Sequence, residues 1–124
     1  MLKILLIEDS VFERKAVSNI LGKNGYTDIV EARGGDEGVI KCGVECPDLV
    51  LLDLQMSGVD GLYVLDRIRE ANPGVKVAIT SIIRDTKTIG DCLSRGAFDY
   101  IAKPITEKKV LVVVEKALKQ SEKL

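Results

Sequence analysis

Short apolar runs alternate along this chain with longer segments that have helical periodicity. Five runs stand out, of which residues 28–32 are the weakest and lie between glycines; the runs cover residues 2–7, 28–32, 49–52, 75–80 and 98–101. Strands that helices cover on both faces have this nearly continuous apolar composition. Strands that alternate with helices of 10 to 15 residues are typical of a parallel α/β sheet. The alternation therefore predicts an α/β fold.

The segments between and after the strands carry signals for helix ends. Ser10 is placed to cap the first helix, Pro73-Gly74 to end the third, Gly96 to end the fourth, and Thr106 to open the last. Right-handed crossovers then give a doubly wound (βα)5 unit, a three-layer sandwich of the flavodoxin-like type. Its parallel five-stranded sheet is predicted to have the order 2-1-3-4-5.

Length and composition narrow the possible functions. The 124 residues suit one domain, residues 1–124, and a net charge of −1 provides no basic surface for nucleic acid. The chain has no histidine, which excludes Ser-His-Asp triads, zinc-histidine sites and phosphohistidine carriage by this chain. The first apolar run stops at Ile7, too short for a signal peptide or a membrane span. We expect a cytoplasmic protein that does not contact the membrane.

The three cysteines do not have the paired spacing of a zinc ribbon. Cys42, Cys46 and Cys92 are an odd set, and thiols in the cytosol are normally reduced. We interpret them as small core residues. Cys42 and Cys46 lie four positions apart on a predicted helix, which leaves a redox or metal role open.

Acidic residues follow two of the predicted strands. Glu8 and Asp9 come after the first strand and Asp53 after the third. In a sheet of order 2-1-3-4-5, ligands bind where strands 1 and 3 diverge, at the carboxyl ends of the strands. Carboxylates that converge there repel one another unless a cation is bound, and hard oxygen ligands suit Mg²⁺. The sequence therefore predicts a magnesium site.

Two further polar residues belong to the same edge of the sheet. Thr80 ends the fourth strand and Lys103 follows the fifth. A hydroxyl and an ammonium opposite a bound metal can hold the oxygens of a transferring phosphoryl group. Asp53 is then the candidate nucleophile, because a carboxylate can accept a phosphoryl group as an acyl phosphate.

Five fragments of the chain, in this order and spacing, resemble the receiver domain of two-component response regulators, specifically the CheY-like single-domain type. They are Ile7-Glu8-Asp9-Ser10, Leu51-Leu52-Asp53-Leu54-Gln55-Met56, Val59-Asp60-Gly61, Ile79-Thr80-Ser81 and Gly96-Ala97-Phe98-Asp99-Tyr100-Ile101-Ala102-Lys103-Pro104. The resemblance covers essentially the whole chain.

The resemblance implies a role for each matching residue around Mg²⁺. Asp53 would be the phosphoacceptor and a metal ligand, Asp9 a direct ligand and Glu8 a ligand through water. The backbone carbonyl of Gln55 would be the remaining protein ligand.

The resemblance also implies how the phosphoryl group is held and sensed. Thr80, Ser81 and Lys103 would bind its oxygens, and Tyr100 would be a rotameric switch that turns inward as Thr80 moves. The Lys103-Pro104 peptide bond would be cis.

Other positions would tune the site or carry the output. Gln55 and Ile82 would control the access of water to the acyl phosphate, and apolar Ile82 is predicted to slow hydrolysis. Ser57 stands where the family usually has proline, which predicts a less rigid loop. Helical spacing places Val112 among lysines, opposite the apolar stripe of the last helix, so we expect it to contact an output partner.

The resulting interpretation is a stand-alone receiver that takes a phosphoryl group from a histidine kinase or phosphotransfer protein and signals by protein binding, in chemotaxis. Beyond its own autophosphorylation and autodephosphorylation it would not be an enzyme, and it would be a monomer or a weak dimer. The output protein would bind the face formed by helix 4, strand 5 and helix 5.

A phosphate sink or phosphorelay intermediate is the alternative. A haloacid-dehalogenase-type phosphatase would need an aspartate where this chain has Gln55. A flavodoxin-like electron carrier would bind a flavin phosphate after strand 1, where Glu8 and Asp9 would repel it.

Overall fold

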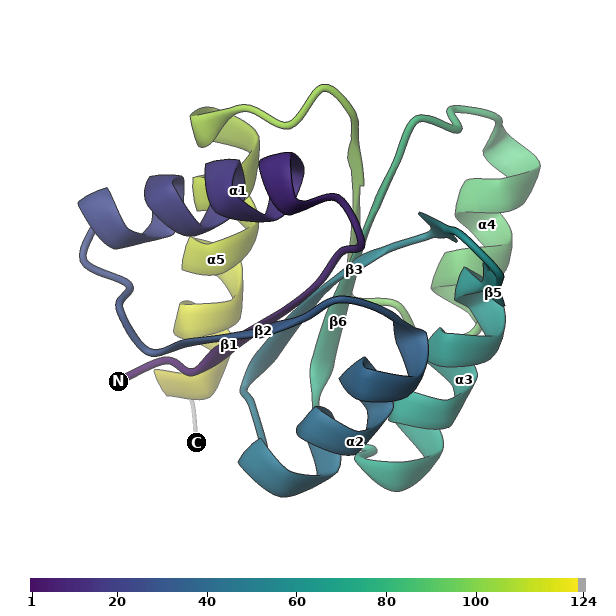
Figure 1. Ribbon diagram of the computed structural model, residues 1–124, viewed down its shortest axis with the longest axis horizontal. Coiled ribbons are helices and arrows are strands. Elements are labelled where there is room, and N and C mark those ends of the chain that lie inside the picture. The colour runs from purple at the N-terminus through teal and green to yellow at the C-terminus, as the bar shows by residue number, and fades with distance from the viewer. Residues whose placement is uncertain (123–124) are drawn as a thin grey trace.

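Five parallel strands form one central sheet in this computed structural model, which describes residues 1–122. The order across the sheet is β2-β1-β3-β6-β7, which confirms the predicted order 2-1-3-4-5 (Figure 1). The strands are β1 Ile4–Ile7, β2 Ile29–Ala32, β3 Leu49–Asp53, β6 Lys76–Ser81 and β7 Asp99–Ala102.

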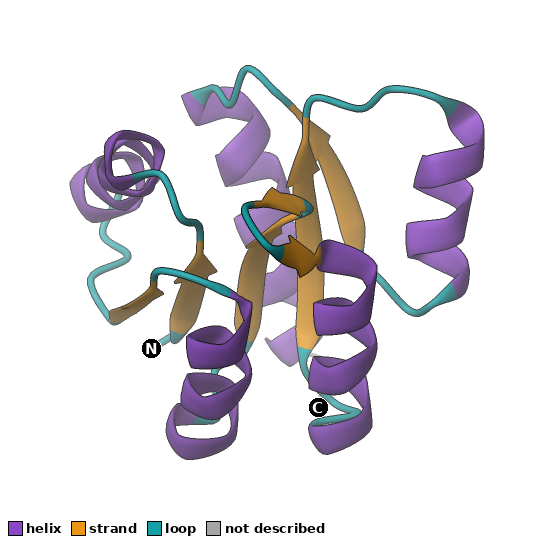
Figure 2. Cartoon of the chain, turned by 45° about the vertical axis from the view of Figure 1, so that its right-hand side comes forward, coloured by secondary structure: helices purple, strands orange, loops and turns teal. Residues whose placement is uncertain are grey.

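Helices cover both faces of the sheet and give the three layers seen in Figure 2. One face carries α1 and α5, and the other carries α2, α3 and α4. The helices are α1 Val11–Lys23, α2 Gly35–Glu45, α3 Gly61–Ala71, α4 Thr86–Ser94 and α5 Glu107–Glu122.

The two faces of the sheet explain why the strands are apolar throughout. Ile4 and Leu6 of β1 pack in the core beneath α1 and α5, whereas Leu5 and Ile7 pack in the core beneath α2, α3 and α4. Successive side chains of a strand point to opposite faces, so a strand between two helical layers has no wet side. The doubly wound α/β prediction is therefore correct for a physical reason.

The first and last helices start at the predicted capping residues, Ser10 and Thr106. The Ser10 hydroxyl accepts a hydrogen bond from the Glu13 backbone N–H at 3.2 Å, as predicted. Asp60 and Asp85 cap α3 and α4 in the same way, accepting from Leu62 and Thr88. Each carboxylate satisfies one backbone N–H that has no partner within the helix.

Two local features differ from the sequence predictions. Residues after Asp53 form a short antiparallel hairpin, β4 Gln55–Met56 and β5 Val59–Asp60, with Gly58 at a positive φ of 73°. The prediction that all three cysteines are core residues is wrong for Cys46, which is exposed in a left-handed conformation where α2 ends. Cys42 and Cys92 are buried, as predicted.

Within residues 1–122, no helix combines the length and the apolar composition that crossing a membrane requires.

Candidate functional site

The carboxyl ends of β1 and β3 bring three acids together. Glu8 and Asp9 follow β1, Asp53 is the last residue of β3, and one carboxylate oxygen from each lies within 4.8 Å of the others. Ile7 pairs with Leu52 across the two strands, so the acids that follow are level with one another. Glu8 and Asp53 are buried, whereas Asp9 is exposed.

Lys103 lies among these carboxylates. Its Nζ is 3.4 Å from Glu8 Oε1, 3.4 Å from Asp53 Oδ1 and 3.1 Å from Glu13 Oε1. Lys103 comes directly after β7, and its backbone N–H donates to the Ser81 carbonyl at 2.8 Å. The peptide bond from Lys103 to Pro104 is cis.

The crowding of charges changes the proton affinity of two groups. Burial is the main cause that raises the pKa of Glu8 to about 7. The hydrogen bond from the Ser10 N–H lowers this pKa, and the nearby negative charge of Asp53 raises it further. Burial acts to lower the pKa of Lys103, but Asp53, Glu13 and Glu8 together raise it above its ordinary value. The site therefore keeps a charged lysine and a carboxyl that titrates near neutral pH.

Backbone N–H groups orient all three acids. Ser10 donates to Glu8 Oε2 at 3.1 Å, Ser57 to Asp9 Oδ2 at 2.9 Å, and Gln55 to Asp53 Oδ1 at 3.1 Å. Hydrogen bonds of this kind hold ligand side chains in place before a metal binds. The Ser57 contact needs a backbone N–H, which a proline at this position would not have.

Two residues of the site were missed by the sequence reasoning. Glu13 bonds Lys103, and buried Arg14 donates to the Glu8 carbonyl at 2.8 Å while pairing with Glu31. Ser10 and Glu13 have the spacing of a capping box, which predicts that Glu13 reaches back to the Ser10 N–H. In the structure the Ser10 N–H donates to Glu8 instead, and the Glu13 carboxylate binds Lys103. The spacing of Ser10 and Glu13 therefore indicates a different partner for Glu13 from the one it has.

The end of β6 supplies the predicted hydroxyl groups. Thr80 pairs with Asp53 across the sheet, and both are buried. The Ser81 hydroxyl accepts from the Ile83 N–H at 3.0 Å and donates to Gln55 Oε1 at 3.4 Å. Ser81 thus ties the β6–α4 loop to the β4–β5 hairpin.

The other predicted residues lie in the hairpin, in the loop after β6, on β7 and on α5. Gln55 Oε1 also accepts from the backbone N–H of Ile82, whose side chain is exposed. Tyr100 is half-buried against the core, and its hydroxyl donates to the Ile83 carbonyl at 2.6 Å. Val112 is exposed on α5 and lines a cavity of about 480 Å³ with Tyr100 and Lys108.

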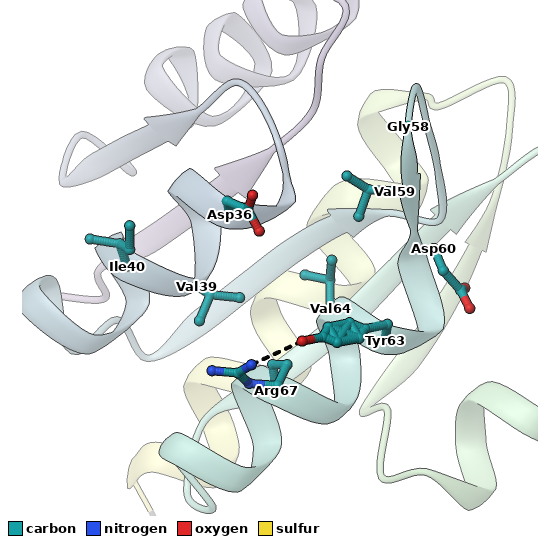
Figure 3. A pocket seen from close by; sticks show the side chains of 9 residues that line it. All are labelled: Asp36, Val39, Ile40, Gly58, Val59, Asp60, Tyr63, Val64 and Arg67. Atoms are coloured by element: carbon teal, nitrogen blue, oxygen red, sulfur yellow. Dashed lines mark hydrogen bonds between the residues drawn. The ribbon is translucent and has the colours of Figure 1, made fainter.

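A cavity of about 730 Å³ lies away from these residues, between α2, the hairpin and α3 (Figure 3). Ile40, Val59 and Tyr63 are among its lining residues, and the Tyr63 hydroxyl accepts a hydrogen bond from Arg67 within it. Neither the clustered acids nor Lys103 line this cavity. Its size is therefore no argument for placing the chemistry there.

The residues present fit a magnesium ion. Glu8, Asp9 and Asp53 offer hard oxygen atoms close to one another, with water access on the Asp9 side. In the described part of the chain this is the one group of three or more acidic, histidine or cysteine side chains with such geometry. Lys103 alone cannot balance the surrounding acids, so a divalent cation would relieve repulsion.

Comparisons with known proteins identify the family of this chain. Residues 4–115 match the model of the response regulator receiver domain. The chemotaxis protein CheY of Listeria monocytogenes is 36% identical over 119 residues, which are 96% of this chain and 100% of that protein.

Two solved structures share the fold over nearly all of the chain. A CheY-like response regulator receiver domain protein from Methanospirillum hungatei has a TM-score of 0.91 at 27% identity, covering 99% of this chain and 98% of that one. The structure of a CheX-CheY-BeF3-Mg²⁺ complex from Borrelia burgdorferi includes a chain with a TM-score of 0.89 at 33% identity, covering 94% of this chain and 89% of that one. The acidic cluster and the match over residues 4–115 lead to one conclusion: this chain belongs to the response regulator receiver domain family.

Proposed function

We propose that this chain accepts a phosphoryl group on Asp53 from a phosphohistidine of a partner kinase or phosphotransfer protein, or from a small acyl phosphate. The observation that carries the proposal is the convergence of Glu8, Asp9 and Asp53 within 4.8 Å, with the Lys103 ammonium beside them. The proposed unit is a single receiver domain, residues 1–124, working in the cytoplasm as a monomer or a weak dimer.

The transfer uses residues whose positions suit it. An Asp53 carboxylate oxygen attacks phosphorus, the phosphorus–nitrogen bond breaks, and its electron pair stays on the imidazole nitrogen of the donor, which takes up a proton. Lys103 stabilises negative charge on the phosphoryl oxygens, and the Thr80 hydroxyl binds one of them. Ser81 would bind another once its hydroxyl gives up its hydrogen bond to Gln55. The same carboxylate can attack the phosphorus of acetyl phosphate with release of acetate, which is the autophosphorylation of this proposal. Water can later attack the phosphorus of the acyl phosphate, which releases inorganic phosphate and restores the Asp53 carboxylate; this is the autodephosphorylation.

Glu8, Asp9, Asp53 and the Gln55 backbone carbonyl are the proposed ligands of Mg²⁺. The ion, when bound, would supply positive charge for the phosphoryl oxygens. The N–H groups of Ser10 and Ser57 support this assignment, because they already orient two of the ligands.

We further propose that phosphorylation changes the surface formed by α4, β7 and α5. The new charge on Asp53 draws Thr80 and Lys103 toward it, and Tyr100 repacks because its hydroxyl contacts the loop that follows Thr80. Val112 lies on this surface and would contact the output protein.

Chemotaxis is the proposed pathway. Relatives that this chain covers in full are named chemotaxis protein CheY, which favours a relay to an output protein over a phosphate sink.

The test is phosphorylation by acetyl phosphate with and without Mg²⁺, followed by intact mass spectrometry. The wild type should gain one phosphoryl group only with Mg²⁺, and Asp53→Asn should gain none. Equal modification of both proteins would overturn the assignment of Asp53.

A further inference from the structure

Glu13 is a residue of the site to which the transfer chemistry gives no role. It lies in the first turn of α1, and its side chain is 40% exposed, whereas the Lys103 side chain is only 11% exposed. The Lys103 ammonium therefore contacts both the buried acids Glu8 and Asp53 and the partly exposed Glu13.

The ammonium has three N–H donors and three carboxylate neighbours. Glu8 Oε1 and Glu13 Oε2 accept hydrogen bonds from it at 3.4 and 3.3 Å, and Asp53 Oδ1 lies 3.4 Å away. An anion bound at Asp53 needs donors from the same ammonium, so Glu13 competes with it for Lys103.

The charge of Glu13 has opposite consequences for the two ions that the site would bind. A fourth carboxylate, in contact with the same Lys103 as Glu8 and Asp53, adds negative charge that attracts a divalent cation. The same carboxylate repels a phosphoryl group and reduces the positive field of Lys103.

Resting on the proposed function, we propose that Glu13 is a positioning residue that holds Lys103 toward α1, strengthens cation binding and weakens the binding of a phosphoryl-like anion at Asp53. Removing its charge therefore moves the two affinities in opposite directions. A residue that only stabilises the fold would weaken both.

Glu13→Gln is the variant that isolates the charge. The backbone N–H of residue 13, which bonds the Ser10 hydroxyl, is unchanged, and Gln is as good a helix former as Glu. Glu45→Gln is the matched control, because Glu45 pairs with Lys3 at 3.3 Å near the opposite end of β1.

Isothermal titration calorimetry measures both affinities, first for Mg²⁺ alone and then for beryllofluoride at saturating Mg²⁺. Glu13→Gln should weaken Mg²⁺ binding about twofold to fivefold and strengthen beryllofluoride binding about threefold to tenfold, the range expected for one charge a few ångströms away in a partly wet site. Glu45→Gln should change neither by that much.

Each result has a distinct meaning. Opposite shifts in Glu13→Gln, absent from Glu45→Gln, support the proposal. Unchanged affinities, or shifts of the same sign, overturn it while leaving Asp53 as the phosphoacceptor. If the wild type binds no beryllofluoride with Mg²⁺ present, the proposed function itself is wrong and the role of Glu13 falls with it.

Discussion

Glu8 couples the acidic site to the stability of the fold. Its pKa is raised from 4.5 to about 7, chiefly by burial. Between these two values the folded protein keeps a proton that the unfolded chain has lost, so the free energy of unfolding decreases as pH rises. This contribution is fully present below pH 4.5 and is lost above about pH 7.

Glu8→Gln should remove this pH dependence. We expect the wild type, free of metal in EDTA, to lose up to about 3 kcal/mol relative to Glu8→Gln between acid and neutral pH. Urea unfolding at several pH values gives the free energy of unfolding of each protein. The titrations of the other acids cancel in the difference between the two free energies. Parallel curves for the two proteins would contradict the burial of a protonated Glu8.

We predict that Ile82 limits the access of water to the site. Its side chain is 65% exposed, and its backbone N–H bonds Gln55, so it stands in the loop at the open edge of the sheet. Ile82→Glu should shorten the lifetime of the acyl phosphate several-fold, because a polar side chain admits and orients water. Phosphate release after removal of acetyl phosphate measures this lifetime, and an unaltered lifetime would exclude the role.

At the scale of elements, two of the three glycines in α2, Gly38 and Gly43, have opposite packing requirements. A Cβ on Gly38 would come within 2.8 Å of Ile7 Cγ1, whereas a Cβ on Gly43 would meet no atom within 4 Å. The close approach of α2 to β1 therefore depends on Gly38.

Alanine substitutions in this one helix should separate packing from propensity. Gly43→Ala should stabilise the protein by about 1 kcal/mol, since alanine is the better helix former. Gly38→Ala should destabilise it by about 1 to 3 kcal/mol through overpacking against Ile7. Denaturant unfolding of both variants tests the pair, and equal effects would contradict the helix–strand contact.

The exposed face of α5 carries the predicted partner contact. Val112 is 54% exposed, with Lys108 and Lys109 lining the same cavity. Val112→Asp should abolish phosphorylation-dependent capture of the output protein, since it places an acid where an apolar anchor among lysines is proposed. Val44→Asp, the same change at an exposed valine of α2, should leave capture intact. Retained affinity in Val112→Asp would end the assignment.

At the scale of the whole molecule, ligand binding should raise stability. A ligand that binds only the folded state adds about 2.7 kcal/mol at a hundred times its dissociation constant. Mg²⁺ with beryllofluoride should therefore raise the Tm of the wild type, and Asp53→Asn should show a much smaller rise. Calorimetry or circular dichroism melts measure the shift, and equal rises in the two proteins would place the anion elsewhere.

The sequence by itself determined the layers, the sheet order and the meeting of the acids. Apolar runs without polar alternation require strands covered on both faces, and residues that end neighbouring parallel strands must meet at one edge. Glu8, Asp9 and Asp53 were therefore predictable from local patterns.

Only the tertiary structure decided what lies between those elements. Cys46 is exposed because α2 ends at this residue in a left-handed conformation. The hairpin after Asp53 consists of two-residue strands, which are too short to produce a periodic pattern in the sequence. Glu13 contacts Lys103 although 90 positions separate them, because α1 and the end of β7 meet in space. Such contacts depend on how helices pack against the sheet, and no local pattern encodes that packing.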